Sequence, residues 1–263
     1  MRLARAACTL TAWLIPAIPV LAQQIPAPPR DELQVKGATA HPPHRDSGKA
    51  YQGRPIADVM SYLGADWLIR GSREDEEQPE AMLDALKIAP GSTVADVGAG
   101  VGYTSVRLAR RVGPRGTVLA TDVQPQMIRM LSANLRAAGI RNVRPIQCTP
   151  TDPKLPEGQV DLALMVDVYH ECSDPETTLR GLRRALKPGG RLVLVEFRGE
   201  DPEVPIKPEH KMTFAQVRRE IEPQGFTFKE KFDFLPWQHI IVFEKPAADA
   251  VAPADAPAPP SRP

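Results

Sequence analysis

Short apolar runs and segments of helical periodicity alternate along the middle of the chain. Val160–Val166 is apolar except for Asp161, a pattern typical of a strand buried on both faces of a sheet. In Gln126–Ala138 the apolar residues recur every three or four positions, which predicts an amphipathic helix, and Gly139 follows as the residue that ends it. The middle of the chain therefore predicts a folded unit in which strands and helices alternate.

The same reasoning, applied from residue 56 to residue 246, predicts a doubly wound α/β fold. We expect strands at Thr93–Val97, Thr117–Asp122, Val143–Gln147, Val160–Val166 and Arg191–Phe197, helices at Tyr103–Val112, Gln126–Ala138, Asp174–Leu186 and Thr213–Gln224, and a closing hairpin from Phe226–Asp233 and His239–Lys245. Strands that are separated by helices pair in parallel. We therefore expect a mostly parallel seven-stranded sheet with helices on both faces and an antiparallel edge strand.

The two ends of the chain differ from this middle region. The sequence holds 29 prolines among 263 residues, and they crowd toward both ends, which indicates that the ends lie outside the compact fold. We expect a signal peptide at 1–22, a proline-rich linker at 23–55, the folded domain at 56–246 and a disordered Ala/Pro-rich tail at 247–263.

The N-terminus has the features of a secretory signal. Arg2 and Arg5 give a positively charged start, and the apolar stretch Ala6–Leu21 follows them. Val20-Leu21-Ala22 supplies a cleavage site after Ala22. The alternative is an uncleaved membrane anchor, but the stretch is short and carries two prolines, which disfavour a spanning helix. We therefore expect an exported protein, periplasmic or secreted, with no stable membrane span after cleavage.

Composition narrows the range of partners. The net charge is +1 at pH 7, so no general attraction to nucleic acid is indicated. The domain contains two cysteines, Cys148 and Cys172, too few for a disulfide framework and not spaced as a zinc motif. His41 and His44 flank a Pro-Pro pair with no further ligand nearby. We predict no metal site, and the sequence leaves the oligomeric state open.

The chemistry is concentrated where the first strand of the domain ends. Val94–Tyr103 places glycines at positions 98, 100 and 102, between a strand and a helix. Glycines let the backbone approach a ligand closely, and a helix N-terminus offers unpaired N–H groups. A dinucleotide fingerprint requires its third glycine one position later, at Tyr103. Asp96 lies two residues before Gly98, where an acid suits a ligand with a cationic amino group.

This segment resembles motif I of the class I S-adenosylmethionine-dependent methyltransferases, which has the pattern Asp-x-Gly-x-Gly-x-Gly. The resemblance continues through Asp122 at the end of the second strand, through Asp161–Glu171, and through Leu186–Glu196 with its Lys-Pro-Gly-Gly turn. The resemblance covers about residues 88–196. Within the family, the sequence is similar to the small-molecule, quinone-methylating branch. The resemblance implies a Rossmann-like sheet, S-adenosylmethionine as cofactor, and methyl transfer to an O-, C- or N-nucleophile of a small-molecule acceptor.

The resemblance also implies a set of cofactor-binding residues: Asp96, Gly98, Gly100, Gly102, Asp122, Asp152 and Asp167. Asp122 would accept hydrogen bonds from both ribose hydroxyls, although it could instead cap a helix, and Asp96 could instead be a buried charge tied to backbone amides. Family members often carry an acid at the adenine edge, but here Thr149 occupies that position. Asp152, three residues later, is either an adenine ligand or a turn residue before Pro153.

The loop after the fourth strand carries the candidate catalytic residues, because ligands of open parallel sheets lie beyond the carboxyl ends of the strands. His170 is the candidate general base, since the unperturbed pKa of histidine suits neutral pH. Tyr169 could stack on or hydrogen-bond to the acceptor, and Glu171 could orient the imidazole. Alternatively, His170 and Glu171 cap the helix that starts near Asp174. Positioning alone can also carry much of the rate of a methyl transfer.

The segments on either side of the core are less informative. In this family the N-terminal segment commonly folds over the active site, which would bring Trp67, Arg70 and Arg73 there; the alternative is a solvated charged helix with arginines paired to Glu74 and Glu77. No role follows for the polar and aromatic residues of the later strand ends, which are Lys207, His210, Lys211, Trp237 and His239.

Two other functions fit parts of the sequence. One is an NAD-dependent oxidoreductase on a similar sheet, which the glycine spacing disfavours. The other is a non-catalytic exported binding module that retains the fold, because S-adenosylmethionine is made inside cells and an exported enzyme would need a supply.

Overall fold

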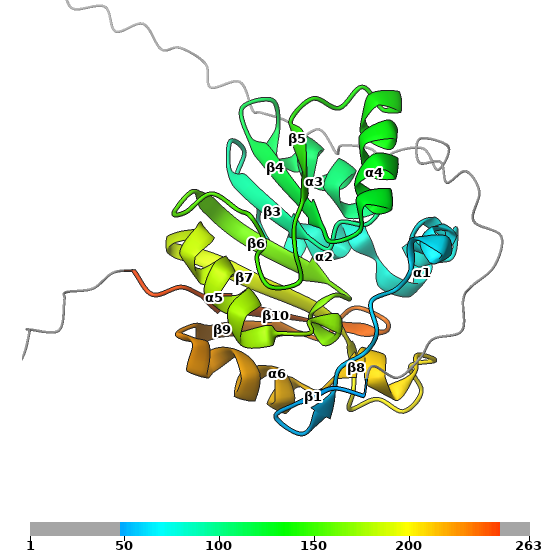
Figure 1. Ribbon diagram of the computed structural model, residues 1–263, viewed down its shortest axis with the longest axis vertical. Coiled ribbons are helices and arrows are strands. Elements are labelled where there is room, and N and C mark those ends of the chain that lie inside the picture. Colours follow the sequence, from blue (N-terminus) through cyan, green and yellow to red (C-terminus); the bar gives the residue numbers. More distant parts are fainter. Residues whose placement is uncertain (1–47, 248–263) are drawn as a thin grey trace, which may run out of the picture.

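The computed structural model describes residues 48–247, so the predicted signal peptide, most of the predicted linker and the tail from residue 248 lie outside the described residues. A mixed sheet runs through the centre of the molecule (Figure 1). Its strands are β3 (Thr93–Val97), β4 (Thr117–Asp122), β5 (Val143–Gln147), β6 (Val160–Val166), β7 (Leu186–Arg198), β8 (Lys211–Met212), β9 (Thr227–Phe232) and β10 (Gln238–Glu244).

The strand order is β5-β4-β3-β6-β7-β10-β9, and the short β8 pairs with β7. The pairs from β5 to β7 are parallel, whereas β10 is antiparallel to both β7 and β9. This confirms the mostly parallel α/β sheet, but the antiparallel strand lies one place in from the edge. The reason is composition: the apolar β10 is buried, and the Lys- and Glu-containing β9 takes the exposed edge, where charged side chains discourage pairing with other chains.

Helices cover both faces of the sheet (Figure 1). The first core packs α2 (Pro79–Ala85), α3 (Tyr103–Val112) and α4 (Pro125–Ala137) on one face, and the second packs α5 (Pro175–Ala185) and α6 (Phe214–Ile221) on the other. Along β6, Leu162 and Leu164 belong to the first core, and Ala163 and Met165 to the second. This alternation is what a strand buried on both faces requires.

The remaining elements are short. They are β1 (Ala50–Tyr51), β2 (Arg54–Pro55), α1 (Arg73–Glu77) and the 3-10 helices η2 (Tyr62–Ile69), η3 (Tyr169–Glu171), η4 (Pro208–His210) and η5 (Glu222–Gln224). Figure 1 shows the segment from β1 to α1, in blue to cyan, passing from the α6 end of the molecule to the α4 end. Within residues 48–247, no helix is long and apolar enough to cross a membrane.

The end of the predicted linker is folded. Residues 50–55 form the β1–β2 hairpin, and the buried Arg54 side chain donates to both carboxylate oxygens of Glu220 in α6, at 2.9 and 3.0 Å. Arg54 also donates to the backbone carbonyl of His170 at 3.0 Å. A linker in solvent was expected up to residue 55. The hairpin folds here because Glu220, which is fully buried, requires a cationic partner.

Candidate active site

A cavity of about 490 Å³ lies at the carboxyl ends of β3, β4 and β6. Gly98, Gly100 and Asp122 line one side, Asp167 follows β6, and His170 and His210 line another part of the wall. The position is the one expected for a ligand site in an open parallel sheet.

The glycine turn forms the wall of the cavity after β3. Gly98, Gly100 and Gly102 have φ angles of 74°, 54° and 95°, which favour glycine. A Cβ atom on Gly98 would lie 2.5 Å from the side chain of Val168. Gly98 and Gly100 line the cavity, whereas Gly102 is the N-cap residue of α3 and lies behind them.

Asp122 ends β4 beside this turn. Its carboxylate accepts the Gly100 N–H at 3.0 Å and the Gln124 N–H at 2.8 Å, and burial raises its pKa. A carboxylate has about four acceptor positions, so each oxygen retains capacity for a ligand hydroxyl. The helix that follows begins at Pro125 with Gln124 as its N-cap residue, so Asp122 does not cap it.

Asp96 does not line the cavity. It is buried and accepts a hydrogen bond from the Ser105 hydroxyl at 2.5 Å, which ties β3 to α3. Burial raises its pKa to about 6, partly offset by that hydrogen bond. This geometry favours the alternative considered from the sequence, a buried charge, over a contact with a ligand amino group. The partner of the carboxylate is a hydroxyl and not the backbone amides of that alternative.

Asp167 fits a cationic ligand group better. It follows β6 with a φ of 54°, which is uncommon for a residue other than glycine. One carboxylate oxygen accepts from the Gln238 side chain at 2.7 Å, and the other, Oδ1, is buried without a hydrogen-bond partner. Burial, together with Glu77 and Glu196, raises its pKa well above the ordinary value. A buried acceptor of this kind calls for a donor, and a ligand ammonium would supply one.

Asp152 lies outside the cavity, and its surroundings favour the alternative considered from the sequence, a turn residue, over an adenine ligand. It is exposed, and its carboxylate accepts the Lys154 N–H at 2.9 Å, which is a local turn contact. Thr149, Pro150 and Pro153 line the cavity at this edge instead. The Asp-Pro pair favours a turn, and the turn points the carboxylate toward solvent.

Tyr169 also lies away from the cavity. Its side chain is fully buried, and its hydroxyl donates to Glu220 at 2.9 Å. The Arg54 guanidinium lies 5.6 Å from the ring centroid. Tyr169 was expected to contact the acceptor, but η3 turns the ring into the core against α6, so it anchors the loop instead.

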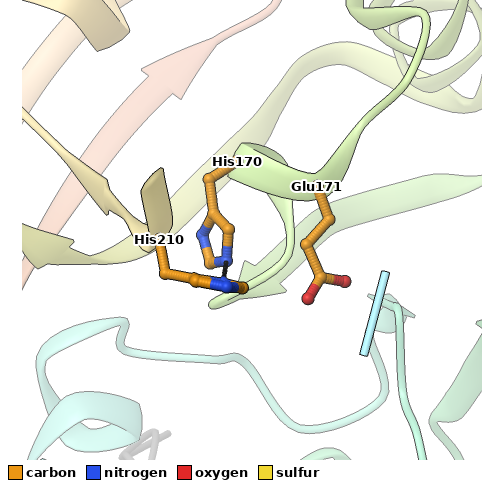
Figure 2. Close-up of side chains that lie close together, drawn as sticks. All are labelled: His170, Glu171 and His210. Carbon is orange, nitrogen blue, oxygen red and sulfur yellow. Dashed lines mark hydrogen bonds between the residues drawn. The ribbon is translucent and has the colours of Figure 1, made fainter. Parts of the chain in front are cut away.

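His170 reaches the cavity, and its partner is a residue that the sequence did not indicate. Its Nδ1 lies 2.6 Å from Glu196 Oε2, at the end of β7. Its Nε2 lies 3.0 Å from Nδ1 of His210 (Figure 2). Burial lowers the pKa of His170, but the Glu196 carboxylate outweighs it, and the net pKa is raised. Glu196, and not Glu171, orients the imidazole.

Glu171 lies on the cavity wall beside His170. It accepts the Met60 N–H at 3.2 Å, which ties the N-terminal segment to η3, and burial raises its pKa to about 7. Neither His170 nor Glu171 caps α5, because the Asp174 side chain does so by accepting the Thr177 N–H at 3.1 Å.

Glu196 and His210 are the site residues that sequence reasoning missed. Glu196 ends an apolar run in β7 and is fully buried, and a single acid at the end of such a strand is a usable signal. His210 belongs to η4, 40 residues from His170. No local pattern marks it, because only the folded chain brings the two histidines together.

The N-terminal segment covers the cavity, as the family resemblance implied. Arg70 pairs with Glu77 at 2.7 Å and stacks on Trp67, with 3.7 Å between its guanidinium carbon and the ring centroid. Arg73, which is buried, pairs with Glu77 at 2.6 Å. Both arginines line the cavity, so they do not belong to the solvated helix that the sequence offered as the alternative. The pairing with Glu77 that this alternative included is present.

Comparison with known proteins agrees with this geometry. Residues 94–190 match the family described as Methyltransferase domain. The chain is 32% identical over 116 residues to the ubiquinone/menaquinone biosynthesis C-methyltransferase UbiE of Vibrio vulnificus, which covers 44% of this chain and 45% of that protein. It is 33% identical over 160 residues to an uncharacterized 37.1 kDa protein in a transposon of Streptomyces fradiae, covering 60% of this chain and 44% of that protein. These matches span less than half the length of both relatives.

Solved structures extend the likeness to about two thirds of the chain or more. A SAM-dependent methyltransferase from Aquifex aeolicus aligns with a TM-score of 0.68 and 26% identity, covering 71% of this chain and 100% of that one. Geranyl diphosphate C-methyltransferase from Streptomyces coelicolor shares the fold, with a TM-score of 0.54, 18% identity, and coverage of 64% and 76%. These comparisons support a class I S-adenosylmethionine-dependent methyltransferase fold, with the family match over residues 94–190. Neither the oxidoreductase nor the non-catalytic alternative finds support in these comparisons.

Proposed function

We propose that this protein transfers a methyl group from S-adenosylmethionine to a small-molecule acceptor bound in the same cavity. The observation that carries the proposal is that one cavity joins two sets of residues with complementary chemistry. Gly98, Gly100 and Asp122 form what we call the cofactor side, and His170, Glu171 and His210 form the acceptor side.

The cofactor side has the groups that S-adenosylmethionine requires. The backbone at Gly98 and Gly100 leaves room for the ligand to lie against it, and Asp122 has acceptor capacity for two ribose hydroxyls. The unpartnered Oδ1 of Asp167 would accept a hydrogen bond from the amino group of the methionine part. We propose no cofactor contact for Asp96, Gly102 or Asp152.

The acceptor side supplies a route for the proton that the acceptor loses. The acceptor's nucleophilic atom attacks the methyl carbon, the carbon–sulfur bond breaks, and its electron pair returns to sulfur to give S-adenosylhomocysteine. The proton of the nucleophile passes to the His170–His210 pair, with Glu196 stabilising the imidazolium that forms.

An apolar acceptor with an ionisable hydroxyl suits the rest of the wall. Met60, Met165, Phe197 and Ile206 line the cavity, and they would pack against an aromatic or prenylated ring. A phenol or quinol combines such a ring with a proton that His170 can take. The Vibrio vulnificus relative acts in ubiquinone/menaquinone biosynthesis by its name, which supports the same class of acceptor.

The test is turnover by the protein that begins at Gln23, with S-adenosylmethionine and a panel of phenols, quinols and small amines. Formation of S-adenosylhomocysteine that depends on one acceptor class is the expected result. Binding of S-adenosylmethionine with no turnover across the panel would contradict methyl transfer to this class, and absence of binding would contradict the proposal as a whole.

We also propose that the protein acts after export. The charged start, the apolar stretch and the Val-Leu-Ala ending support cleavage after Ala22. N-terminal sequencing of protein from its native host should give Gln23 as the first residue, and an intact Met1 in the cytoplasmic fraction would overturn both cleavage and export.

A further inference from the structure

The geometry points to a binding site for a divalent transition-metal ion, formed by His170 Nε2, His210 Nδ1 and the carboxylate of Glu171. The site stands on its own geometry, whereas the use of the ion in catalysis, described below, rests on the proposed function. Figure 2 shows His170 and Glu171 extending side by side from η3, with the His210 ring reaching them from a separate segment.

The ligand atoms are already near the spacing that a metal ion imposes. All three lie within 4.8 Å of one another, and the two nitrogens are 3.0 Å apart. With metal–ligand bonds of about 2.1 Å, two ligands lie about 3.0 Å apart at a right angle and about 3.4 Å apart at the tetrahedral angle. The distance between the two histidine nitrogens therefore already suits a metal ion. Because the nitrogens now face each other in a hydrogen bond, each ring would have to turn so that its lone pair points at the ion, and a rotation of the Glu171 side chain would bring in the third ligand.

The surroundings hold each ligand in place. Glu196 lies 2.6 Å from His170 Nδ1, and a carboxylate on one ring nitrogen directs the lone pair of the other nitrogen toward a metal ion. Glu196 also accepts the Tyr169 N–H at 2.9 Å, so it is itself fixed. The His170 carbonyl accepts from Arg54 and from the Ala57 N–H. This support is what distinguishes a built site from an accidental group of side chains.

The donor set selects the kind of metal. Two imidazoles and one carboxylate suit Zn²⁺, Fe²⁺ or Co²⁺, whereas Mg²⁺ prefers oxygen ligands. All three residues line the cavity, so the remaining coordination positions face the space where the acceptor would lie. Three protein ligands with open positions are typical of a catalytic rather than a structural site.

An ion here would act as a Lewis acid on the acceptor. The acceptor hydroxyl would bind the ion and release its proton to solvent, and the resulting oxyanion would attack the methyl carbon, while the carbon–sulfur electron pair returns to sulfur. The ion would take the place of the proton shared between the two histidines, so the loaded enzyme would not need His170 as a base.

The experiment is a titration of the EDTA-treated protein, starting at Gln23, with ZnCl₂ by calorimetry and with CoCl₂ by visible absorption. His41 and His44 are replaced by alanine in the background, because both lie outside the described residues and are potential ligands. We expect one Zn²⁺ per chain, displacement of Co²⁺ by Zn²⁺, and no comparable binding of Mg²⁺. His210→Ala and Glu171→Gln should each weaken Zn²⁺ binding at least about 10-fold, and Glu196→Gln by about 10-fold to 100-fold.

Glu157→Gln is the matched control, because it makes the same chemical change at an exposed position that does not line the cavity. It should leave Zn²⁺ affinity unchanged. Absence of Zn²⁺ binding, or unchanged affinity in His210→Ala, would overturn the site, as would a near-ultraviolet thiolate band with Co²⁺, which would indicate Cys172 as a ligand. Turnover without Zn²⁺ binding would leave the proposed function intact, and Zn²⁺ binding without turnover would leave the metal site intact.

Discussion

The cofactor side and the acceptor side of the cavity are held together by different kinds of contact. On the cofactor side, backbone hydrogen bonds join neighbouring strand ends: the N–H groups of Gly98 and Ala99 both donate to the Thr121 carbonyl at 2.9 Å. On the acceptor side, charged side chains join remote segments, as in the Arg54–Glu220 pair and the His170–Glu196 pair. The first side depends on the path of the backbone, and the second depends on buried charge.

This difference implies that the two sides respond to substitution differently. Loss of a single carboxylate on the cofactor side removes ligand contacts while the parallel sheet keeps its shape. Loss of one member of a buried ion pair on the acceptor side leaves the other charge without a partner, and that is costly. The side-chain substitutions below separate the two sides by whether they change turnover, stability or cofactor affinity.

The largest effect should come from His170→Ala. In the metal-free protein, loss of the proton acceptor on the acceptor side should lower the kcat of the folded fraction by about 10²-fold to 10⁴-fold. The dissociation constant for S-adenosylhomocysteine should change little. Steady-state kinetics with the best acceptor from the panel and calorimetry with S-adenosylhomocysteine measure the two quantities. A wild-type kcat in the alanine variant would show that the acceptor side contributes positioning alone.

Tyr169→Phe is the matched control for His170, since it changes the adjacent residue and removes only a hydroxyl that faces Glu220. Its kcat should remain close to that of the wild type. A loss of kcat as large as that of His170→Ala would place the tyrosine hydroxyl in the reaction, contrary to its burial away from the cavity.

The second effect should be on stability. Arg54→Met leaves Glu220 buried without its cationic partner, which should lower the free energy of unfolding by about 3–5 kcal/mol. Urea denaturation measures this. The control is Arg218→Met, in the same helix as Glu220, which removes the half-exposed partner of Glu222. It should lower the free energy of unfolding by no more than about 1 kcal/mol. Equal losses in the two variants would show that the N-terminal hairpin is not held by the buried pair.

The third effect should be on cofactor affinity alone. Asp122→Asn removes charged acceptor capacity, and it should weaken S-adenosylhomocysteine binding by about 1.5–3 kcal/mol, or roughly 10-fold to 150-fold. Calorimetry measures the change. Asp161→Asn makes the same change at the opposite end of a strand, near the start of β6, and should leave the affinity unchanged. Unchanged affinity in Asp122→Asn would remove Asp122 from the ligand contacts.

The same difference between the two sides explains what could be predicted from the sequence. The alternation of strands and helices predicted the α/β class correctly, because each element is specified within about ten residues. The glycine turn could be recognised in the sequence because its spacing is local. The sequence did not predict that Glu196 and His210 lie beside His170. The pairing of β6 with β7 brings Glu196 there, and the position of η4 brings His210 there. Tyr169 was misplaced for the same reason: its partners, Arg54 and Glu220, lie 115 and 51 residues away by the sequence numbering.

The smallest effect should come from Asp152→Ala. The family pattern favours an adenine ligand near this position, whereas the structure has the carboxylate in a local turn contact with the Lys154 N–H, outside the cavity. Affinity for S-adenosylhomocysteine should therefore change by less than about 0.5 kcal/mol, the range for surface substitutions away from special features. The loss of the turn hydrogen bond should lower the free energy of unfolding by about 1 kcal/mol at most. Calorimetry on Asp152→Ala and Asp122→Asn in parallel gives the comparison. If Asp152→Ala weakened binding as much as Asp122→Asn, the turn at Asp152 would have to rearrange when the cofactor binds. The backbone hydrogen bonds at Thr121 would then not be enough to fix the cofactor side.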